Sequence, residues 1–183
     1  MSLLKPLTLA LLAAAIAGCS NLPNSTAKSA EATPDNEDWY QVRTENELYL
    51  FDDYSVFREF LDTGKAPYLK DLEQKDKYGQ SIVLGLRAED RDKDLTKVAA
   101  HRFLQVSQPP ASKFYGEIRQ EGVIYVFARY GDMIDMNKIG EPIFSHTEIA
   151  SGPNGERVVY VLAKEEKKPV EQIKLFQSKY KRA

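Results

Sequence analysis

Histidine and cysteine, the residues that most often act as bases, nucleophiles and metal ligands, are scarce in this chain. Among its 183 residues are two histidines and one cysteine. His101 and His146 lie far apart in sequence and form no paired metal-ligand motif such as H-E-x-x-H. Ser145 precedes His146 in an expected strand, where neighbouring side chains point to opposite faces, so the two are poorly placed as nucleophile and base. We interpret both histidines as solvent-facing or internally satisfied residues.

The acidic residues suggest two further kinds of site, a calcium loop and a pair of catalytic carboxylates. Asp132, Asp135 and Asn137 lie close together, but a calcium loop needs oxygen ligands at alternate positions around a central glycine. Here the glycine comes before the run, so we expect a loop or a helix cap. Adjacent acids at 89–90 and 165–166 are easily found in a chain with 27 acidic residues, and we interpret them as solvated charges.

The composition and the missing motifs exclude several classes of protein. Apolar residues make up 43% of the chain and charged residues 28%, which is typical of a globular protein. A net charge of -2 does not indicate a nucleic-acid partner. One cysteine excludes an intramolecular disulfide and a zinc site of several thiolates. Phosphate-binding glycine motifs and G-x-S-x-G are absent as well. The sequence therefore predicts no catalytic residue, no cofactor and no metal, and we expect a protein that is not an enzyme.

Residues 1–18 have the features of an export signal. Lys5 is their only charged residue, and the apolar stretch from Pro6 to Gly18 is too short for a bilayer, which needs about 20 apolar residues. A positive start, a short apolar core and small residues at the end are typical of a secretory signal peptide. We therefore predict that residues 1–18 form such a signal peptide.

The residues Ile16-Ala17-Gly18-Cys19 resemble the lipobox of bacterial lipoproteins. The resemblance implies cleavage between Gly18 and Cys19, a diacylglycerol on the Cys19 thiol and, usually, acylation of the new amino terminus. Each buried lipid CH₂ contributes about 0.8 kcal/mol, so two or three acyl chains anchor a protein stably. In Gram-negative lipoproteins an aspartate after the cysteine favours the inner membrane, and here Ser20 implies the outer membrane. The resemblance thus implies an outer-membrane lipoprotein, and we expect its domain to face the periplasm.

A polar segment follows the cysteine. Residues 20–38 contain no aromatic and no β-branched aliphatic residue, and Ser, Asn, Thr, Ala and Pro dominate. Such a segment cannot bury enough apolar area to offset its ordering entropy. We predict that residues 19–38 hold the lipidated cysteine and a flexible tether with a root-mean-square span of roughly 25 Å. A single domain is expected over residues 39–183.

Alternating strands and helices are expected after Trp39. Strands are expected at 39–43, 47–51, 81–86, 114–119, 123–128, 143–150 and 157–163, and helices at 54–64, at 95–102 and from 169 onward. Short turns, including an Asn-Gly turn within 151–155, favour antiparallel pairing. The run at 123–128 is apolar throughout and predicts a central strand covered on both faces. We predict an α+β fold, a mainly antiparallel curved sheet with helices packed on one face. No internal repeat is apparent.

Two groups of residues could recognise a partner. Tyrosines on the expected strands could form a recognition face, although we favour ordinary cross-strand packing: Tyr40, Tyr49, Tyr115, Tyr125, Tyr130 and Tyr160. The last ten residues carry four cations, Lys174, Lys179, Lys181 and Arg182, and no acid. They could meet anionic headgroups, although we favour their complementing the dipole of a terminal helix.

Taken together, these features predict a lipid-anchored envelope lipoprotein with a non-enzymatic binding or assembly-accessory domain. Its partners would be the membrane, through Cys19, and an envelope protein. An alternative is a periplasmic immunity or inhibitor lipoprotein that neutralises a toxin or an enzyme. A less favoured alternative is a cell-wall or lipid hydrolase, which would need paired carboxylates in a deep pocket.

Overall fold

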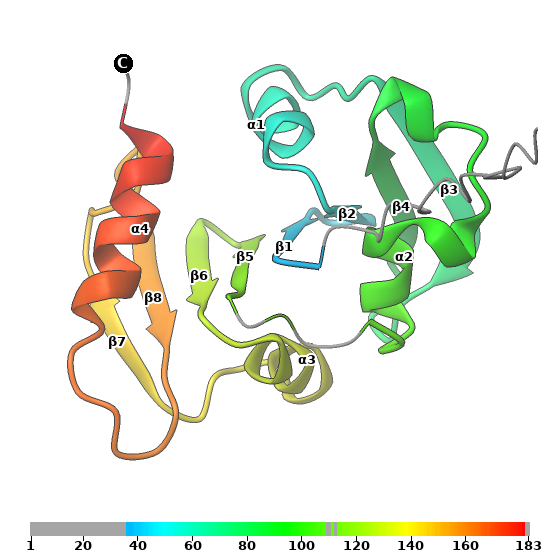
Figure 1. Ribbon diagram of the computed structural model, residues 1–183. Helices are drawn as coiled ribbons and strands as arrows, with labels where there is room; N and C mark the ends of the chain where they lie inside the picture. Colours follow the sequence, from blue (N-terminus) through cyan, green and yellow to red (C-terminus); the bar gives the residue numbers. More distant parts are fainter. Residues whose placement is uncertain (1–35, 109–110, 112, 182–183) are drawn as a thin grey trace, which may run out of the picture. The chain divides into compact units, whose positions relative to one another are not determined.

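Eight strands form one sheet in the computed structural model of the chain, which describes residues 36–108, 111 and 113–181 (Figure 1). The strands are β1 (Asp38–Arg43), β2 (Glu47–Phe51), β3 (Tyr68–Lys75), β4 (Ser81–Leu86), β5 (Tyr115–Gln120), β6 (Val123–Phe127), β7 (Ser145–Glu148) and β8 (Arg157–Val161). The helices are α1 (Tyr54–Thr63), α2 (Ala99–Leu104), α3 (Tyr130–Ile139) and α4 (Val170–Tyr180). Two 3-10 turns, η1 (Ala88–Asp90) and η2 (Leu95–Lys97), precede α2. In space the strands follow the order β3-β4-β2-β1-β5-β6-β8-β7.

The expected α+β class is confirmed, and antiparallel pairing is in the majority. Among the described residues, four of the seven strand pairings are antiparallel and three are parallel. The parallel pairs arise because α1 and α3 each connect one hairpin to the next, so β4 returns beside β2 and β8 returns beside β6. All four hairpin turns consequently lie at the same end of the sheet.

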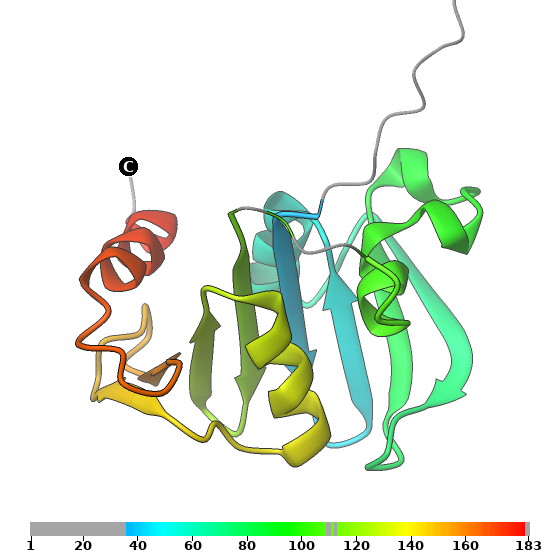
Figure 2. The same cartoon turned by 60° about the horizontal axis from the view of Figure 1, so that its bottom comes forward.

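The helices cover both faces of the sheet, which corrects the prediction of helices on one face. Figure 2 shows α3 in front of the strands and α1 behind them. Residues of α1 and α4 pack with Tyr40 and Tyr160, whereas residues of α2 and α3 pack with Trp39 and Leu84. Because successive residues of the central strands are large and apolar, both faces must be covered to remove them from water.

The chain contains an internal repeat, contrary to the sequence-based expectation. β1-β2-α1-β3-β4-α2 and β5-β6-α3-β7-β8-α4 repeat the same order of elements, and the strands of each half are arranged in the same way. The first strands of the two halves, β1 and β5, pair in parallel at the centre. Because α1 and α3 lie on opposite faces, a pseudo-two-fold axis along the strands, between β1 and β5, relates the halves.

Every residue of the first half is separated from its equivalent in the second half by the same number of residues along the chain. α1 and α3 each have 10 residues, begin at Tyr54 and Tyr130, and are capped by Gly64 and Gly140, both with positive φ. Identical residues occupy the equivalent positions 43/119, 45/121, 49/125, 51/127, 54/130, 64/140, 79/155, 83/159 and 86/162. These identities are scattered, so the repeat is clear in the fold and hard to recognise from the sequence.

Two elements differ from the sequence-based expectation. β3 was not expected, because its sequence YLKDLEQK carries many charges; such charges are common on edge strands, where they prevent pairing with other chains. α3 occupies residues that we expected to form a loop or a helix cap. Its local signal is weak, because glycine follows its first residue and its apolar residues form no clear stripe. No helix within the described ranges is long and apolar enough to cross a membrane.

Candidate functional site

The residues proposed from the sequence for lipidation, Gly18, Cys19 and Ser20, lie outside the described residues. The two histidines lie on separate elements, His101 on α2 and His146 on β7. His146 Nε2 lies 3.6 Å from an oxygen of Glu148 on the same strand. The structure therefore does not bring the histidines together.

The aspartates considered for a calcium loop lie on α3. Asp132 forms an ion pair with Arg129, with an N–O distance of 2.6 Å. Asn137 Oδ1 accepts a hydrogen bond from Arg43 at 3.2 Å, and Asp135 is exposed. Within the described residues, no cluster of three or more His, Cys, Asp or Glu side chains could hold a metal ion.

The six tyrosines considered for a recognition face pack into the core or against it. Tyr40 and Tyr160 are fully buried, and Tyr115 and Tyr130 are nearly so. Tyr49 and Tyr125 are partly buried against the two clusters. The structure thus contradicts the recognition face and supports cross-strand packing.

Two buried polar side chains occupy equivalent positions of the repeat, one in each half. Gln41 on β1 is 1% exposed, and its equivalent Glu117 on β5 is 0% exposed. Each lies between an aromatic residue and an arginine on the same face of its strand: Trp39 and Arg43 flank Gln41, and Tyr115 and Arg119 flank Glu117. We call the two places the Gln41 site and the Glu117 site.

The Glu117 site is filled by donors from the chain itself. Glu117 accepts hydrogen bonds from the hydroxyl of Tyr115 at 2.9 Å, from the hydroxyl of Tyr180 at 2.7 Å and from Nε of Arg119 at 2.7 Å. Arg119 also reaches Glu156, at 3.2 Å. Burial, together with the charge of Glu117, raises the pKa of Tyr115 and of Tyr180, so both phenols stay protonated and act as donors.

Lys179 lies beside the Glu117 site, among tyrosines. Its ammonium nitrogen is 3.0 Å from the hydroxyl of Tyr40. The same nitrogen lies 4.6 Å from the ring centre of Tyr54 and 4.5 Å from that of Tyr115, which is within the range of a cation-π contact. Asp38 lies 3.6 Å from the same nitrogen. Lys179 therefore contributes to the packing around the Glu117 site, and not to the basic surface that we considered for the terminal cations.

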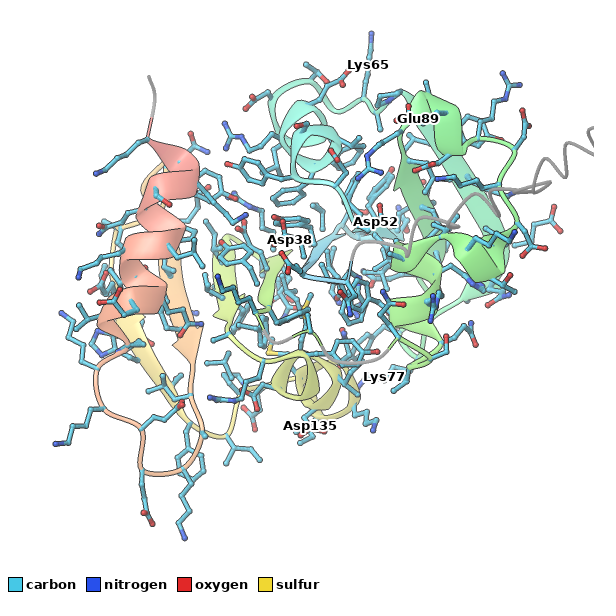
Figure 3. The ribbon with its side chains drawn as sticks, in the orientation of Figure 1. Asp38, Asp52, Lys65, Lys77, Glu89 and Asp135 are labelled. Atoms are coloured by element: carbon cyan, nitrogen blue, oxygen red, sulfur yellow. The ribbon has the colours of Figure 1, made fainter. Side chains whose placement is uncertain are left out.

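The Gln41 site is open. A pocket of about 200 Å³ adjoins it; its walls come mainly from Trp39, Gln41, Leu48, Leu104, Val106 and Ile134. Trp39 Nε1 and Gln41 Oε1 are buried and have no hydrogen-bond partner among the described residues. Lys77, which also lines the pocket, lies between α2 and α3 in Figure 3.

Arg43 lies between the Gln41 pocket and the hairpin turns, where several side chains accept hydrogen bonds from it. Its guanidinium donates to Asp76 and to Gln80, each at 2.5 Å, and Arg43 and Asp76 are almost fully buried. Burial opposes the ionisation of Asp76, but hydrogen bonds from Arg43 and from the amides of Gln80 and Tyr78 outweigh it and lower the pKa of Asp76. The equivalent Arg119 makes the corresponding contact with Glu156.

A cleft of about 730 Å³ lies at the end of the sheet where the hairpin turns are. We call it the Arg43 cleft. Three turns contribute to it, together with Arg43 and the end of α3: Thr44 and Glu45, Tyr78 and Gln80, and Gln120 and Glu121, with Gly140 from α3. Glu45 and Glu121 are equivalent residues of the repeat, and both are exposed.

Comparison of the chain with models of protein families, with curated proteins and with solved structures finds no match. The sites must therefore be interpreted from their own chemistry. The sequence patterns did not single out Gln41, Arg43, Glu117 or Arg119. A usable signal was present, because polar residues at inward positions of otherwise apolar strands usually have a specific role.

Proposed function

We propose that the chain is a lipid-anchored lipoprotein of the bacterial envelope whose domain binds a partner protein, without catalysis, through the Arg43 cleft. The anchor rests on the lipobox resemblance around Cys19. The binding surface rests on the cleft, which combines a volume of about 730 Å³ with polar side chains from both halves of the repeat.

The position of the cleft relative to the start of the domain is the observation that carries this proposal. β1 begins at Asp38, where the expected tether joins the sheet, and ends at Arg43, which lines the cleft. Six extended residues span roughly 20 Å. A lipid tether attached at Asp38 would therefore leave the cleft at the opposite end of the strand free to meet a partner.

The charges at the cleft indicate the chemistry of the partner. The charge of Arg43 is compensated by Asp76, whereas the carboxylates of Glu45 and Glu121 are exposed at the rim. Tyr78, which is 58% exposed, adds an aromatic surface. Complementary charge favours a partner segment that is basic, and an exposed tyrosine suits a hydrated protein interface.

The acidic rim also favours the alternative function, inhibition of a basic toxin or enzyme in the periplasm. Both functions would use the same cleft, and they differ in what binding does to the partner. Loss of the partner's own activity on binding would support inhibition, whereas unchanged partner activity would support an assembly or accessory role.

The lipid anchor can be tested by labelling cells with an alkynyl fatty acid. The full chain should carry the label and fractionate with the outer membrane, whereas Cys19→Ala should lose the label and its membrane association. Ser20→Asp should keep the label and shift the protein towards the inner membrane. Equal labelling of the wild type and Cys19→Ala would exclude lipidation at this cysteine.

The binding surface can be tested with a photoreactive amino acid, p-benzoylphenylalanine, incorporated in cells. Placed at Tyr78, it should crosslink a defined envelope protein, and placed at Glu59, an exposed residue of α1, it should not. The double change Glu45→Lys and Glu121→Lys should reduce the crosslink, whereas Glu59→Lys should leave it unchanged. The same products from both positions would contradict the role of the cleft.

A further inference from the structure

The repeat identifies the residue that should fill the Gln41 site. Tyr54 donates its hydroxyl to the backbone oxygen of Lys179, and the equivalent Tyr130 donates to the backbone oxygen of Phe103 at 3.0 Å. Phe103 and Lys179 are therefore equivalent positions near the ends of α2 and α4. The residues that come after them, Leu104 and Tyr180, must be equivalent too.

This equivalence accounts for the difference between the two sites. In the Glu117 site, the phenol ring of Tyr180 reaches the carboxylate and donates its hydroxyl at 2.7 Å. In the Gln41 site, the side chain of Leu104 is shorter and carries no hydroxyl. The pocket of about 200 Å³ lies there, next to the unpartnered oxygen of Gln41.

The walls of the pocket match a ring that carries one hydroxyl. Leu48, Leu104 and Ile134 offer apolar surface. Trp39 Nε1 is a donor and Gln41 Oε1 an acceptor, and the two residues lie on the same face of β1. A buried polar group without a partner is costly, so a ligand that satisfies these groups gains affinity over one that only fills the space.

We propose that the Gln41 pocket binds a phenolic ring, which takes the place that Tyr180 takes in the Glu117 site. The hydroxyl donates to Gln41 Oε1, as Tyr180 donates to Glu117, and the indole N–H of Trp39 is the donor available to it. The ring packs against the leucines. The lining of this pocket shares Arg43 with the Arg43 cleft, but the proposal does not depend on partner binding there.

The mouth of the pocket gives the ring a way in. Val106, next to α2, lines the pocket and is 55% exposed. On the side of α3, Lys77 donates to the backbone oxygen of Lys138 at 2.6 Å. These two lysines disfavour a cationic ligand, and Arg43 is already paired with Asp76, so a hydroxyaromatic group without a positive charge suits the site better than a cationic one.

The test uses the mature lipoprotein in detergent and follows the indole N–H resonance of Trp39, the only tryptophan of the chain. p-Cresol should shift this resonance saturably and bind up to about tenfold more tightly than toluene, since one hydrogen bond in a buried site is worth up to about 1.4 kcal/mol. No saturable shift, or equal binding of both probes, would overturn the proposal.

Two substitutions locate the binding. Leu104→Tyr should abolish p-cresol binding by placing the chain's own phenol in the pocket. Leu175→Tyr, the same change at a position of α4 that is 45% exposed, should leave the affinity unchanged. If Leu104→Tyr does not fold, Gln41→Leu serves instead, because it should remove the preference for p-cresol over toluene. Wild-type binding by Leu104→Tyr would overturn the assignment of the pocket.

A second probe, N-acetyl-L-tyrosinamide, distinguishes the two sources of such a ring. Saturable binding of both probes at the Trp39 resonance supports the site and indicates that a tyrosine side chain of another protein can enter. Binding of p-cresol alone supports the site and indicates a free small phenol. Binding of neither probe contradicts the proposal.

Discussion

The hydroxyl of Tyr180 lies 2.7 Å from both carboxylate oxygens of Glu117, which ties the last turn of α4 to the central strand β5. Glu117 is fully buried, and a buried charge is tolerated only when it is paired and hydrogen-bonded. Tyr115 and Arg119 supply the remaining donors. The carboxylate therefore holds together parts of the sheet and the terminal helix that are distant in sequence.

Tyr180→Phe should lower the free energy of unfolding by about 1.5–3 kcal/mol, the range for a hydrogen bond to a charged group. The ring is kept, and so are its contacts with Arg58 and Arg119, so the change isolates the hydroxyl. Denaturant unfolding measures the effect. Tyr125→Phe, at a half-buried position of β6, is the matched control and should cost less than about 0.5 kcal/mol. Equal losses in the two variants would contradict the role of the hydroxyl.

Lys179→Met should also destabilise the fold, by about 1–2 kcal/mol, because it keeps an apolar stem and removes a partly desolvated ammonium from two tyrosine rings. It also removes the contact with Asp38. Lys174→Met, at an exposed site on the same helix, is the control and should change the stability little. If both variants unfold at the same denaturant concentration as the wild type, the tyrosine contacts of Lys179 do not stabilise the fold.

The strands and helices with strong local signals could be predicted from the sequence. The helix expected at 54–64 is α1, which Asp53 caps by accepting a hydrogen bond from the amide of Val56 at 2.9 Å and which Gly64 ends. The apolar run of β6 is a central strand, as expected. The local sequence pattern could not predict that helices cover both faces of the sheet, because this depends on which strands the crossover helices α1 and α3 connect.

The candidate sites were beyond sequence reasoning for a different reason. Gln41 and Glu117 look like ordinary polar residues until the strand register places them inward, and their significance depends on distant residues such as Leu104 and Tyr180. The repeat that makes these pairs equivalent maintains the fold with few identities, since large apolar residues substitute freely for one another in a core. Local periodicity carries no information about such long-range pairs.

Asp76→Asn should make the free energy of unfolding less dependent on pH in the acidic range. Hydrogen bonds from Arg43 and two amides lower the pKa of folded Asp76 below its ordinary value, so its charged form stabilises the fold above the unfolded pKa of about 3.9. This contribution is lost as the pH falls through the lowered, folded-state value. At pH 7 the variant should be less stable by about 1–3 kcal/mol, and the difference should shrink below about pH 4.

Unfolding measured from pH 7 down to pH 2 tests this expectation. Asp135→Asn, at an exposed position of α3, should follow the wild type throughout. A constant difference between Asp76→Asn and the wild type at all pH values would show that packing, and not the charge of Asp76, causes the loss.

Leu104 is equivalent to Tyr180, and Gln41 is equivalent to Glu117. We therefore predict that substitutions at Leu104 and Gln41 are coupled in their effect on stability. Gln41→Glu alone should destabilise the fold, because it buries a carboxylate that has no phenol to donate to it. Leu104→Tyr alone fills the pocket and donates to the amide oxygen of Gln41. The double variant reproduces the arrangement of the Glu117 site, so the two changes should be coupled favourably by about 1.5–3 kcal/mol in a double-mutant cycle. Pairing Gln41→Glu with Leu175→Tyr, whose side chain is exposed on α4, should give additive effects. Additivity in both cycles would mean that the two halves share a fold without sharing the geometry of this site.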